Sequence, residues 1–459
     1  MPRKVFISFL GTSQYQECQY SYPDGSGEFS ESVRFIQEAT LDYLVNKDTW
    51  TSEDAVYIFL TEASKTNWID GHTFVTEFVD ANGAKHKRED KQEKGLLSRL
   101  NDFKRKNGLN FHIEEKLPII LLTKDEEKDM WKIFEKVFSV IKDEDWLYID
   151  VTHGYRYLPM FLLILCNYSK FLKKVKVKSI TYGNFEDKKD GVAPIVDLQP
   201  LSHLQDWTFA AGDFINNGNA SRLISLSREK ISPILKETFG QDEDAKLMQG
   251  FVKGVESLVS DIYTCRGVKL ASDDNNRLYL LKENINKLNE SLIAPFNPIV
   301  NEINKIINEF DSQPSSKNGF HAAAWCVEHN MYQQAITILE ENIVTAICEK
   351  HHLPIDDNKR ARPLVCDAFS LTIEKLKPSE NRQAFRSTFA VDDFELFCSL
   401  VNDKIIVDLA SDFSKIREIR NDFNHSGMRN EPKPKDAQKM ILEIQKIVDK
   451  VTEYFKNGV

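Results

Sequence analysis

Short apolar runs alternate with helical repeats of apolar residues over the first part of the chain. The runs have the length and the β-branched and aromatic content of buried strands. The stretches between them place apolar residues on one face of a helix. This pattern predicts strands at residues 4–10, 54–61, 117–122, 146–151, 175–182 and 194–198. It predicts helices at residues 30–45, 125–141 and 157–171.

Strands that alternate with helices predict a doubly wound, Rossmann-like α/β domain whose sheet is mostly parallel. The charged stretch at residues 80–108 is predicted to be an exposed helix and loop. From Leu201 onward the strand pattern fades and helical spacing continues, which predicts an all-α remainder. Residues 311–319 have the composition of a loop. We therefore expect three parts: an α/β domain at 1–200, a helical coupling region at 201–318 and a helical domain at 319–459.

Small or polar turns follow three of the predicted strands. These turns are Gly11-Thr12-Ser13, Thr152-His153-Gly154-Tyr155-Arg156 and Gly183-Asn184. Ligands of doubly wound sheets bind outside the carboxyl ends of the strands, so we expect the three turns to converge on one pocket. Backbone N–H groups, hydroxyls and an arginine suit a phosphate, although the glycine fingerprint of dinucleotide-binding folds is absent from the sequence. The pattern leaves open whether this pocket is an active site or a receptor.

A second group of polar residues lies on the helix predicted at residues 411–427. Its apolar stripe consists of Phe413, Ile416, Ile419 and Phe423. Beside that stripe, helical spacing places Arg417, Arg420, Asn421, Asn424 and His425. Arginine can hold a phosphate and histidine can move a proton near neutral pH, which are the functions that metal-free RNA cleavage needs. A solvated polar helix end has the same spacing, so spacing alone does not separate the two interpretations.

Composition restricts the partners and the compartment. The net charge of −10 repels nucleic acid, so an RNA-binding role requires a local basic site. Seven scattered cysteines without a CxxC pair favour a reducing compartment and argue against a disulfide framework or a zinc site. The sequence shows no signal peptide and no apolar run of membrane-spanning length. We expect a cytoplasmic protein with no membrane association and no bound metal or cofactor.

Three segments resemble the CARF sensor domains of type III CRISPR ancillary proteins. They are Asp150-Val-Thr-His-Gly-Tyr-Arg-Tyr-Leu-Pro159, Ile180-Thr-Tyr-Gly183 and the stretch at 204–214. The segment Arg420-Asn-Asp-Phe-Asn-His425 resembles the Arg-x4-His motif of HEPN ribonucleases. Sensor and helical effector come in the same order as in the CARF–HEPN ribonucleases, and the resemblance covers nearly the whole chain.

The resemblance implies an antiviral single-stranded-RNA endoribonuclease that cyclic oligoadenylate activates, with cyclic tetra-adenylate favoured. It implies a homodimer, or a higher assembly, in which two sensor domains share one ligand and two motifs form a composite active site. Cleavage would need no metal and would leave a 2′,3′-cyclic phosphate. The implied catalytic residues are Arg420 and His425, with Asn421 in support. The implied ligand-binding residues are Gly11, Thr12, Ser13, Thr152, His153, Gly154, Arg156, Gly183 and Asn184.

Two alternatives stay open at the level of the sequence. The chain could be a catalytically silent nucleotide sensor whose helical domain binds a partner protein. The sensor pocket could instead degrade its own cyclic ligand, with Thr152 and His153 as the residues to test. The activator's ring size, the RNA sequence preference and the individual roles of Arg420 and His425 do not follow from the sequence.

Overall fold

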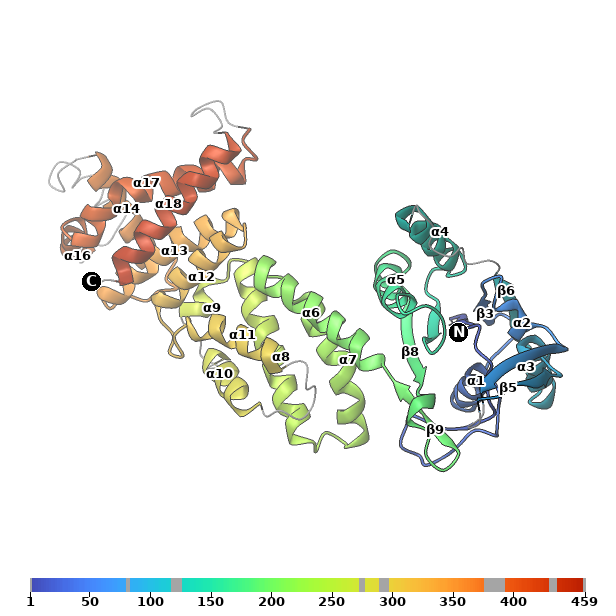
Figure 1. Ribbon diagram of the computed structural model, residues 1–459. Helices are drawn as coiled ribbons and strands as arrows, with labels where there is room; N and C mark the ends of the chain where they lie inside the picture. The colour runs from blue at the N-terminus through green and yellow to red at the C-terminus, as the bar shows by residue number, and fades with distance from the viewer. Residues whose placement is uncertain are drawn as a thin grey trace. The chain divides into compact units, whose positions relative to one another are not determined.

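The computed structural model describes residues 2–79, 83–116, 126–271, 277–288, 297–374, 393–428 and 436–456. These residues form two compact units, Met1–Gln205 and Asp206–Val459 (Figure 1). The first unit contains all the described strands, and the second is helical. The predicted fold class, an α/β domain followed by a helical region, is therefore confirmed.

Seven strands form the sheet of the α/β unit in the order β2-β9-β8-β7-β1-β3-β6. Their bounds are β1 Lys4–Phe9, β2 Gln19–Ser21, β3 Ala55–Phe59, β6 His112–Lys116, β7 Trp146–Asp150, β8 Lys176–Gly183 and β9 Val192–Asp197. All neighbouring pairs are parallel except β8 and β9. The five strands predicted outside residues 117–122 are present, each with shifted ends, whereas the sheet strands β2 and β6 were not predicted. The strand predicted at 117–122 lies outside the described residues.

Helices cover both faces of this sheet. Val5, Ile7 and Phe9 of β1 belong to the core beneath α4 (Glu126–Ser139) and α5 (Leu158–Lys173). Phe6 and Leu10 belong to the opposite core, with residues of α1 (Ile36–Lys47) and α3 (Leu96–Lys106). Successive side chains of a strand point to opposite faces, so a strand buried on both sides reads as a continuous apolar run. This is why β1 was recognisable in the sequence.

A charged hairpin corrects one prediction. Residues 80–108 were expected to form only helix and loop, but β5 (Lys85–Gln92) pairs antiparallel with β4 (His72–Val79). Most of β5 is exposed, so its sequence KHKREDKQ lacks the apolar alternation that identifies a half-buried strand. The helix α3 in the same stretch agrees with the prediction. A short helix, α2 (Lys65–Trp68), precedes β4.

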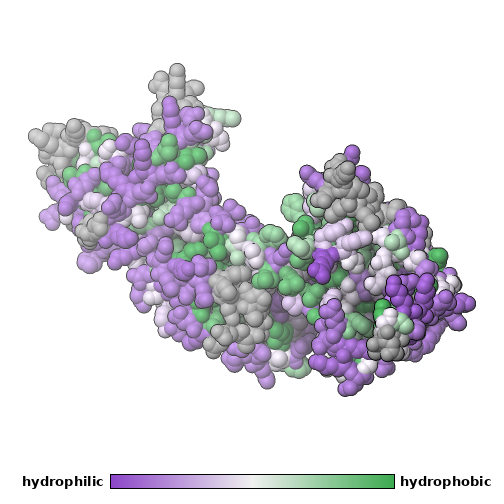
Figure 2. All heavy atoms as spheres, viewed as in Figure 1, coloured by the Kyte–Doolittle hydropathy of each residue, from purple (hydrophilic) through white to green (hydrophobic). Residues whose placement is uncertain are grey.

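Apolar side chains remain exposed along one side of α5. Met160 is 70% exposed, Ile164 61%, Tyr168 44% and Phe171 83%. These positions follow helical spacing and so form one stripe, called the α5 stripe below. Figure 2 shows apolar side chains at the surface of the α/β unit among hydrophilic ones. A stripe of this kind on an otherwise polar surface is typical of a contact face.

The helical unit has one apolar core that runs from Trp207 to Val451. Its helices are α6 Gln199–Asn217, which begins in the first unit, α7 Ser221–Glu237, α8 Glu243–Tyr263, α9 Gly267–Ala271, α10 Arg277–Lys287, α11 Asn297–Asn308, α12 Ser316–Glu328, α13 Tyr332–Lys350, α14 Ala361–Glu374, α16 Asp393–Val401, α17 Lys404–Asn424 and α18 Ala437–Lys456. A 3-10 turn, η1 (Phe185–Asp187), lies between β8 and β9. Among the described residues, no helix is both long and apolar enough to span a membrane. The predicted division at residue 318 stays a prediction.

Candidate ligand site and candidate catalytic helix

The order of the strands places a crevice between β1 and β7. From β1 the chain passes through the edge strand β2, beside β9, and returns through α1 to β3 on one side of β1, whereas β7 continues through α5 to β8 on the other side. β1 and β7 are neighbours, and β3 and β8 lie on opposite sides of this pair, which makes it the switch point where doubly wound sheets bind ligands. Gly11 follows β1 and Thr152 follows β7. The strand order thus brings together two turns that are far apart in the sequence.

A hollow of about 210 Å³ lies at this switch point. Its lining comprises Phe9, Leu10, Gly11, Thr12, Ser13, Tyr15, Phe59, Thr61, Thr152, His153, Gly154, Tyr155 and Leu158. Six of the nine residues predicted to bind the ligand belong to this lining: Gly11, Thr12, Ser13, Thr152, His153 and Gly154. Of the described residues, the lining includes none of Arg156, Gly183 and Asn184. Residues 11–13 are called the first loop below, and residues 152–156 the glycine turn.

A buried carboxylate holds the glycine turn in place. Asp150 is fully buried, and its Oδ1 accepts hydrogen bonds from Thr152 N–H at 3.1 Å and Thr152 Oγ1 at 2.5 Å. Its Oδ2 accepts a hydrogen bond from Ser8 Oγ of β1 at 2.6 Å. Burial raises the pKa of Asp150, and the hydrogen bonds from Ser8 and Thr152 oppose that shift. Asp150 therefore joins the ends of the two strands that carry the hollow.

Thr152 also connects the hollow to the third predicted turn. The Gly183 N–H donates to Thr152 Oγ1 at 2.7 Å. A Cβ at position 183 would lie 2.6 Å from Ile36 Cδ1, so only glycine allows β8 to end this close to α1. The Asn184 N–H donates instead to the carbonyl of Pro194, and Arg156 is exposed on its turn. Gly183 is thus adjacent to the site through Thr152, whereas the structure does not bring Arg156 into the hollow.

His153 adds an aromatic ring to the hollow. Its ring centroid lies 4.5 Å from that of Tyr15. Burial lowers the pKa of His153 to about 4, so the imidazole is neutral at pH 7. Burial likewise raises the pKa of Tyr15. A phosphate in the hollow would therefore be bound by N–H groups and hydroxyls, and not by an imidazolium ion.

Several lining residues were not predicted. Thr61 follows β3, so the strand-end argument that selected Gly11 and Thr152 also applied to it. Tyr155 belongs to the glycine turn, is 44% exposed, and its ring is nearly parallel to that of Tyr157 at 6.0 Å. Nothing in the local sequence marks Tyr15, because its place depends on the path of the loop after β1. An exposed aromatic ring at the rim of a hollow can stack on a nucleobase.

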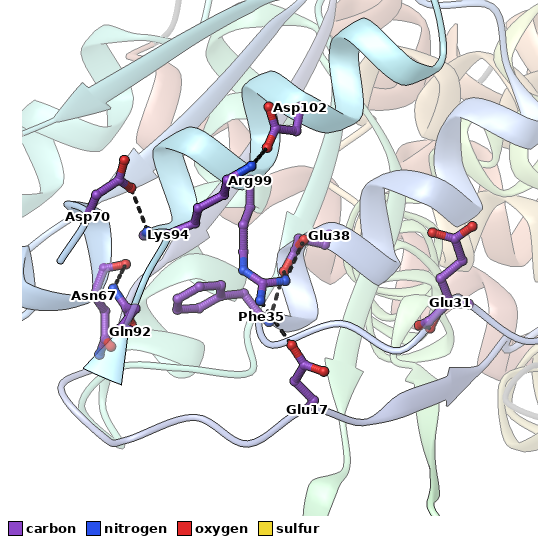
Figure 3. Close-up of polar contacts among 12 residues, drawn as sticks. Glu17, Glu31, Phe35, Glu38, Asn67, Asp70, Gln92, Lys94, Arg99 and Asp102 are labelled. Carbon is purple, nitrogen blue, oxygen red and sulfur yellow. Dashed lines mark hydrogen bonds and ion pairs between the residues drawn. The ribbon is translucent and has the colours of Figure 1, made fainter. Parts of the chain in front are cut away.

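Asn67 anchors the first loop, and Figure 3 shows this side chain beside Gln92. Asn67 is fully buried, and its Nδ2 donates to the carbonyls of Gly11 and Ser13, both at 3.0 Å. Gln92, at the end of β5, donates through Nε2 to the carbonyl of Asn67 at 3.4 Å and to that of Ile69 at 3.1 Å. The hairpin β4–β5 is therefore linked to the ligand site through α2.

The start of α1 supports the same site. Glu38 accepts a hydrogen bond from Phe35 N–H at 3.1 Å and lies 3.4 Å from Arg99 of α3, as Figure 3 shows. These contacts fix the first turn of α1, on which Gln37 is also fully buried. Gln37 Nε2 donates to Ser8 Oγ at 3.0 Å. Ser8 can then donate its single proton to Asp150, so the side chains form one directed chain of hydrogen bonds.

The predicted catalytic residues lie at the end of α17 in the helical unit. Phe413, Ile416 and Ile419 are buried, as the predicted stripe requires. Arg420 is 31% exposed, and its Nη1 lies 3.0 Å from Glu340 Oε1 of α13. Arg417 Nε lies 3.7 Å from the same oxygen. The sequence did not indicate Glu340, because α13 and α17 are remote in the chain.

Asn421, Asn424 and His425 are exposed. His425 ends the helix, and its N–H donates to the carbonyl of Asn421 at 3.1 Å. The structure therefore places the predicted pair in different surroundings, with Arg420 in ion pairs and His425 open to solvent. Their catalytic roles stay a prediction. Within the described residues, no three His, Cys, Asp or Glu side chains gather in a way that could hold a metal ion.

The fold and the hollow at its switch point define a Rossmann-like ligand-binding domain. Residues 5–186 match the family model of the CRISPR system endoribonuclease Csx1, CARF domain. The CRISPR-associated protein MJ1674 of Methanocaldococcus jannaschii is 23% identical over 237 residues, which are 51% of this chain and 34% of that protein. The chain thus spans about a third of the length of this relative.

Enterococcus italicus Csm6 bound to cyclic hexa-2′-fluoro-hexa-dAMP is a similar solved structure, with a TM-score of 0.40 and 10% identity. That comparison covers 100% of this chain and 95% of the other. The α/β unit is therefore a CARF domain, and the chain is similar to CRISPR-associated proteins. The predicted resemblance is confirmed in this respect, while the likeness of the helical unit to HEPN ribonucleases stays a prediction.

Proposed function

We propose that the chain is a single-stranded-RNA endoribonuclease activated by cyclic oligoadenylate bound at the hollow of the CARF domain. The observation that carries this proposal is the convergence of the first loop and the glycine turn at the switch point of the sheet. Cyclic tetra-adenylate is the favoured activator on the basis of the family resemblance. In this proposal the α/β unit is the receptor and the helical unit carries the catalytic residues.

The chemistry of the hollow suits a cyclic ring of phosphates and bases. Backbone N–H groups and the hydroxyls of Thr12 and Ser13 can donate to phosphate oxygens. Tyr155 offers a partly exposed ring on which an adenine can stack. With about 210 Å³, the hollow is smaller than the roughly 300–1,000 Å³ typical of drug-sized ligands. One hollow therefore suits part of a cyclic oligonucleotide, which supports a ligand shared by two protomers.

The α5 stripe supports a homodimer of this kind. It begins at Met160, four positions after the glycine turn ends at Arg156, so a copy docked on α5 would have its own glycine turn nearby. The exposed apolar side chains of the stripe supply the kind of surface that association buries. Two hollows brought together at a two-fold axis would form one site of twice the size.

Catalysis in this proposal belongs to the end of α17. Arg420 stabilises the negative charge that develops on the scissile phosphate, and His425 transfers a proton at the 2′-hydroxyl or the leaving oxygen. The exposed amide of Asn421 can orient the RNA. The 2′-hydroxyl attacks the neighbouring phosphorus, the bond to the 5′-oxygen breaks, and a 2′,3′-cyclic phosphate remains. No metal is required for this step.

A cleavage assay tests the proposal. A fluorescent single-stranded RNA is incubated with the full-length protein and EDTA, together with cyclic tri-, tetra- or hexa-adenylate. Cleavage is expected with one of these activators and is expected to be lost in Arg420→Ala and His425→Ala. Cleavage that survives both substitutions would place the active site elsewhere. If the wild-type protein binds an activator but cleaves no RNA, the silent-sensor alternative is the better account.

One observation favours a second activity, the degradation of the cyclic ligand by the CARF domain itself. His153 lines the hollow next to Thr152, and its imidazole is neutral at pH 7, while the burial that lowers its pKa to about 4 makes it a weak base. A neutral imidazole can accept the proton of a 2′-hydroxyl of the bound ligand. Incubation with cyclic tetra-adenylate should then give shorter or linear products, and His153→Ala should prevent their formation. An intact ligand after long incubation with the wild-type protein would rule out this second activity.

A further inference from the structure

Two carboxylates of α13 hold the guanidinium of Arg420, and they differ in burial. Glu340 is only 8% exposed, and its Oε1 lies 3.0 Å from Arg420 Nη1. Glu341 is 47% exposed, and its Oε1 lies 3.4 Å from Arg420 Nη2. Arg362 binds the second oxygen of Glu341 at 2.7 Å. The proposed catalytic arginine is therefore oriented by its own protomer, by one buried contact and one accessible contact.

Packing holds α13 and α17 in place around the contact between Glu340 and Arg420. Leu339 and Ile343 of α13 are buried on either side of Glu340, and Ile416 and Ile419 of α17 are buried below Arg420. Further along, Asp403 joins the end of α13 to the start of α17. Its side chain accepts from Ile405 N–H at 2.8 Å and lies 2.9 Å from Lys350 Nζ and 2.8 Å from His351 Nε2. The two helices cannot easily separate, so Glu340 stays beside Arg420.

We infer that Glu340 is a positioning residue that fixes the Arg420 guanidinium for RNA cleavage, and this inference rests on the proposed ribonuclease function. A carboxylate buried in the core cannot leave when a phosphate arrives, so Arg420 must work with Glu340 attached. The exposed Glu341 is the side chain that can give way, which frees Nη2 for a phosphate oxygen. Glu340 thus orients the planar guanidinium of Arg420, while its Nη2 binds a phosphate oxygen of the substrate.

The alternative to positioning is that the two carboxylates mask Arg420 until the activator binds, and the two roles predict opposite effects of removing Glu340. If the carboxylates masked Arg420 until activation, removal of Glu340 would release the arginine and raise basal cleavage. If Glu340 positions Arg420, its removal lets the guanidinium rotate away from the attack geometry and lowers the rate. Burial favours positioning, because a mask that must be displaced is better placed at the surface.

The test compares Glu340→Ala, Glu340→Gln, Glu341→Gln and the control Glu418→Gln, an exposed carboxylate of α17, in the full-length protein with saturating activator. Glu340→Ala should lower kcat about 100-fold with little change in KM, since misplacement of a catalytic group by about 1 Å costs that much. Glu340→Gln keeps an acceptor of the same shape and should recover part of the rate. Glu341→Gln removes only the longer, accessible contact and should lower the rate less than Glu340→Ala does, whereas Glu418→Gln should cleave at about the wild-type rate. Melting curves identify any variant that fails to fold. If Glu340→Ala fails to fold, the kcat of the isosteric Glu340→Gln decides whether Glu340 positions Arg420.

Either of two results would overturn the inference while the ribonuclease proposal stands: wild-type kcat in a folded Glu340→Ala, or cleavage by that variant without activator. An inert wild-type protein would instead contradict the ribonuclease proposal. The contact itself has an independent readout in ¹⁵N NMR of the arginine side chains. Restricted rotation should give Arg420 resolved Nη signals in the wild type and in Glu341→Gln, and these should vanish in Glu340→Ala. Unresolved signals in the wild type would overturn the positioning role regardless of activity.

Discussion

His153 contributes a ring, and not a charge, to the hollow at neutral pH. Burial removes water from the imidazole and lowers its pKa to about 4, below the value near 6.5 expected in an unfolded chain. The folded protein therefore binds this proton more weakly than the unfolded protein does. The stability that His153 contributes is present above about pH 6.5 and is lost as the pH falls towards about 4.

We expect His153 to titrate with a midpoint near 4 in a histidine NMR titration of the folded protein. The free energy of unfolding, measured in urea, should fall between about pH 6.5 and about 4 by up to about 1.4 kcal/mol per pH unit from this group. His153→Phe keeps a ring but cannot titrate, so its unfolding curve should depend less on pH over this interval. A midpoint near 6.5 would show that the ring is solvated.

Gly154 is a second residue on which the hollow depends. Its φ of +115° lies in a region that residues with a side chain rarely adopt, and an added Cβ would lie 2.8 Å from Leu158 Cδ1. Gly154→Ala should destabilise the CARF domain by about 1–3 kcal/mol and weaken activator binding at least tenfold. Gly191→Ala is the matched control, because its φ of +88° brings the same strain into open space. Calorimetric titration should show normal affinity for Gly191→Ala, and equal losses in both variants would contradict a local effect at Gly154.

At the level of elements, the sequence predicted the strands that are buried on both faces of the sheet and missed the exposed strand β5. β1 and β7 are continuous apolar runs, and residues of the turns after them, which were predicted as ligand residues because strand ends have a known role in this fold, line the hollow. β5 was missed because its charged residues follow no apolar alternation. Asn67 and Glu340 could not be predicted, since each acts on a residue of another element and only the tertiary fold brings the partners together.

The α5 stripe leads to a prediction about assembly. Ile164→Glu combined with Phe171→Glu puts two charges on the stripe and should convert the proposed dimer to a monomer in analytical ultracentrifugation, because burial of unpaired charges is unfavourable. Leu442→Glu is the control, because this leucine is 55% exposed on α18 of the helical unit. A dimer that persists in the α5 variant would place the contact on another face. Loss of the dimer should also weaken activator binding if the ligand is shared.

At the scale of the whole molecule, the receptor and the proposed catalytic helix lie in different compact units. Asp150 and Thr152 belong to the α/β unit, whereas Glu340 and Arg420 belong to the helical unit. Activation at one site by a ligand at the other is then a coupling of binding free energies, and such a coupling acts equally in both directions. Substitutions in the hollow should shift the activator concentration that is needed, whereas substitutions at Arg420 should change the rate at saturation.

Reciprocity can be measured without cleavage. In His425→Ala, an uncleaved RNA should tighten the binding of cyclic tetra-adenylate by the same factor by which cyclic tetra-adenylate tightens the binding of RNA. Couplings of this kind usually amount to about 5–150-fold. Fluorescence anisotropy with each ligand labelled in turn measures both factors. Unequal factors would mean that an additional equilibrium, such as dimer formation, accompanies one of the two binding events.

The hydrogen bond between Ser8 and Asp150 also determines when the ligand site can form during synthesis of the chain. The two residues are 142 positions apart, and the sheet between them is completed only when β7 enters beside β1. At about 5–20 residues per second, a ribosome needs roughly 7–28 seconds to synthesise the intervening chain. Throughout this interval the first loop has left the peptidyl-transferase centre but has no Asp150 or Thr152 beside it. The hollow is therefore incomplete in the growing chain, and the proposed cyclic ligand can bind only after β7 and the glycine turn have been made.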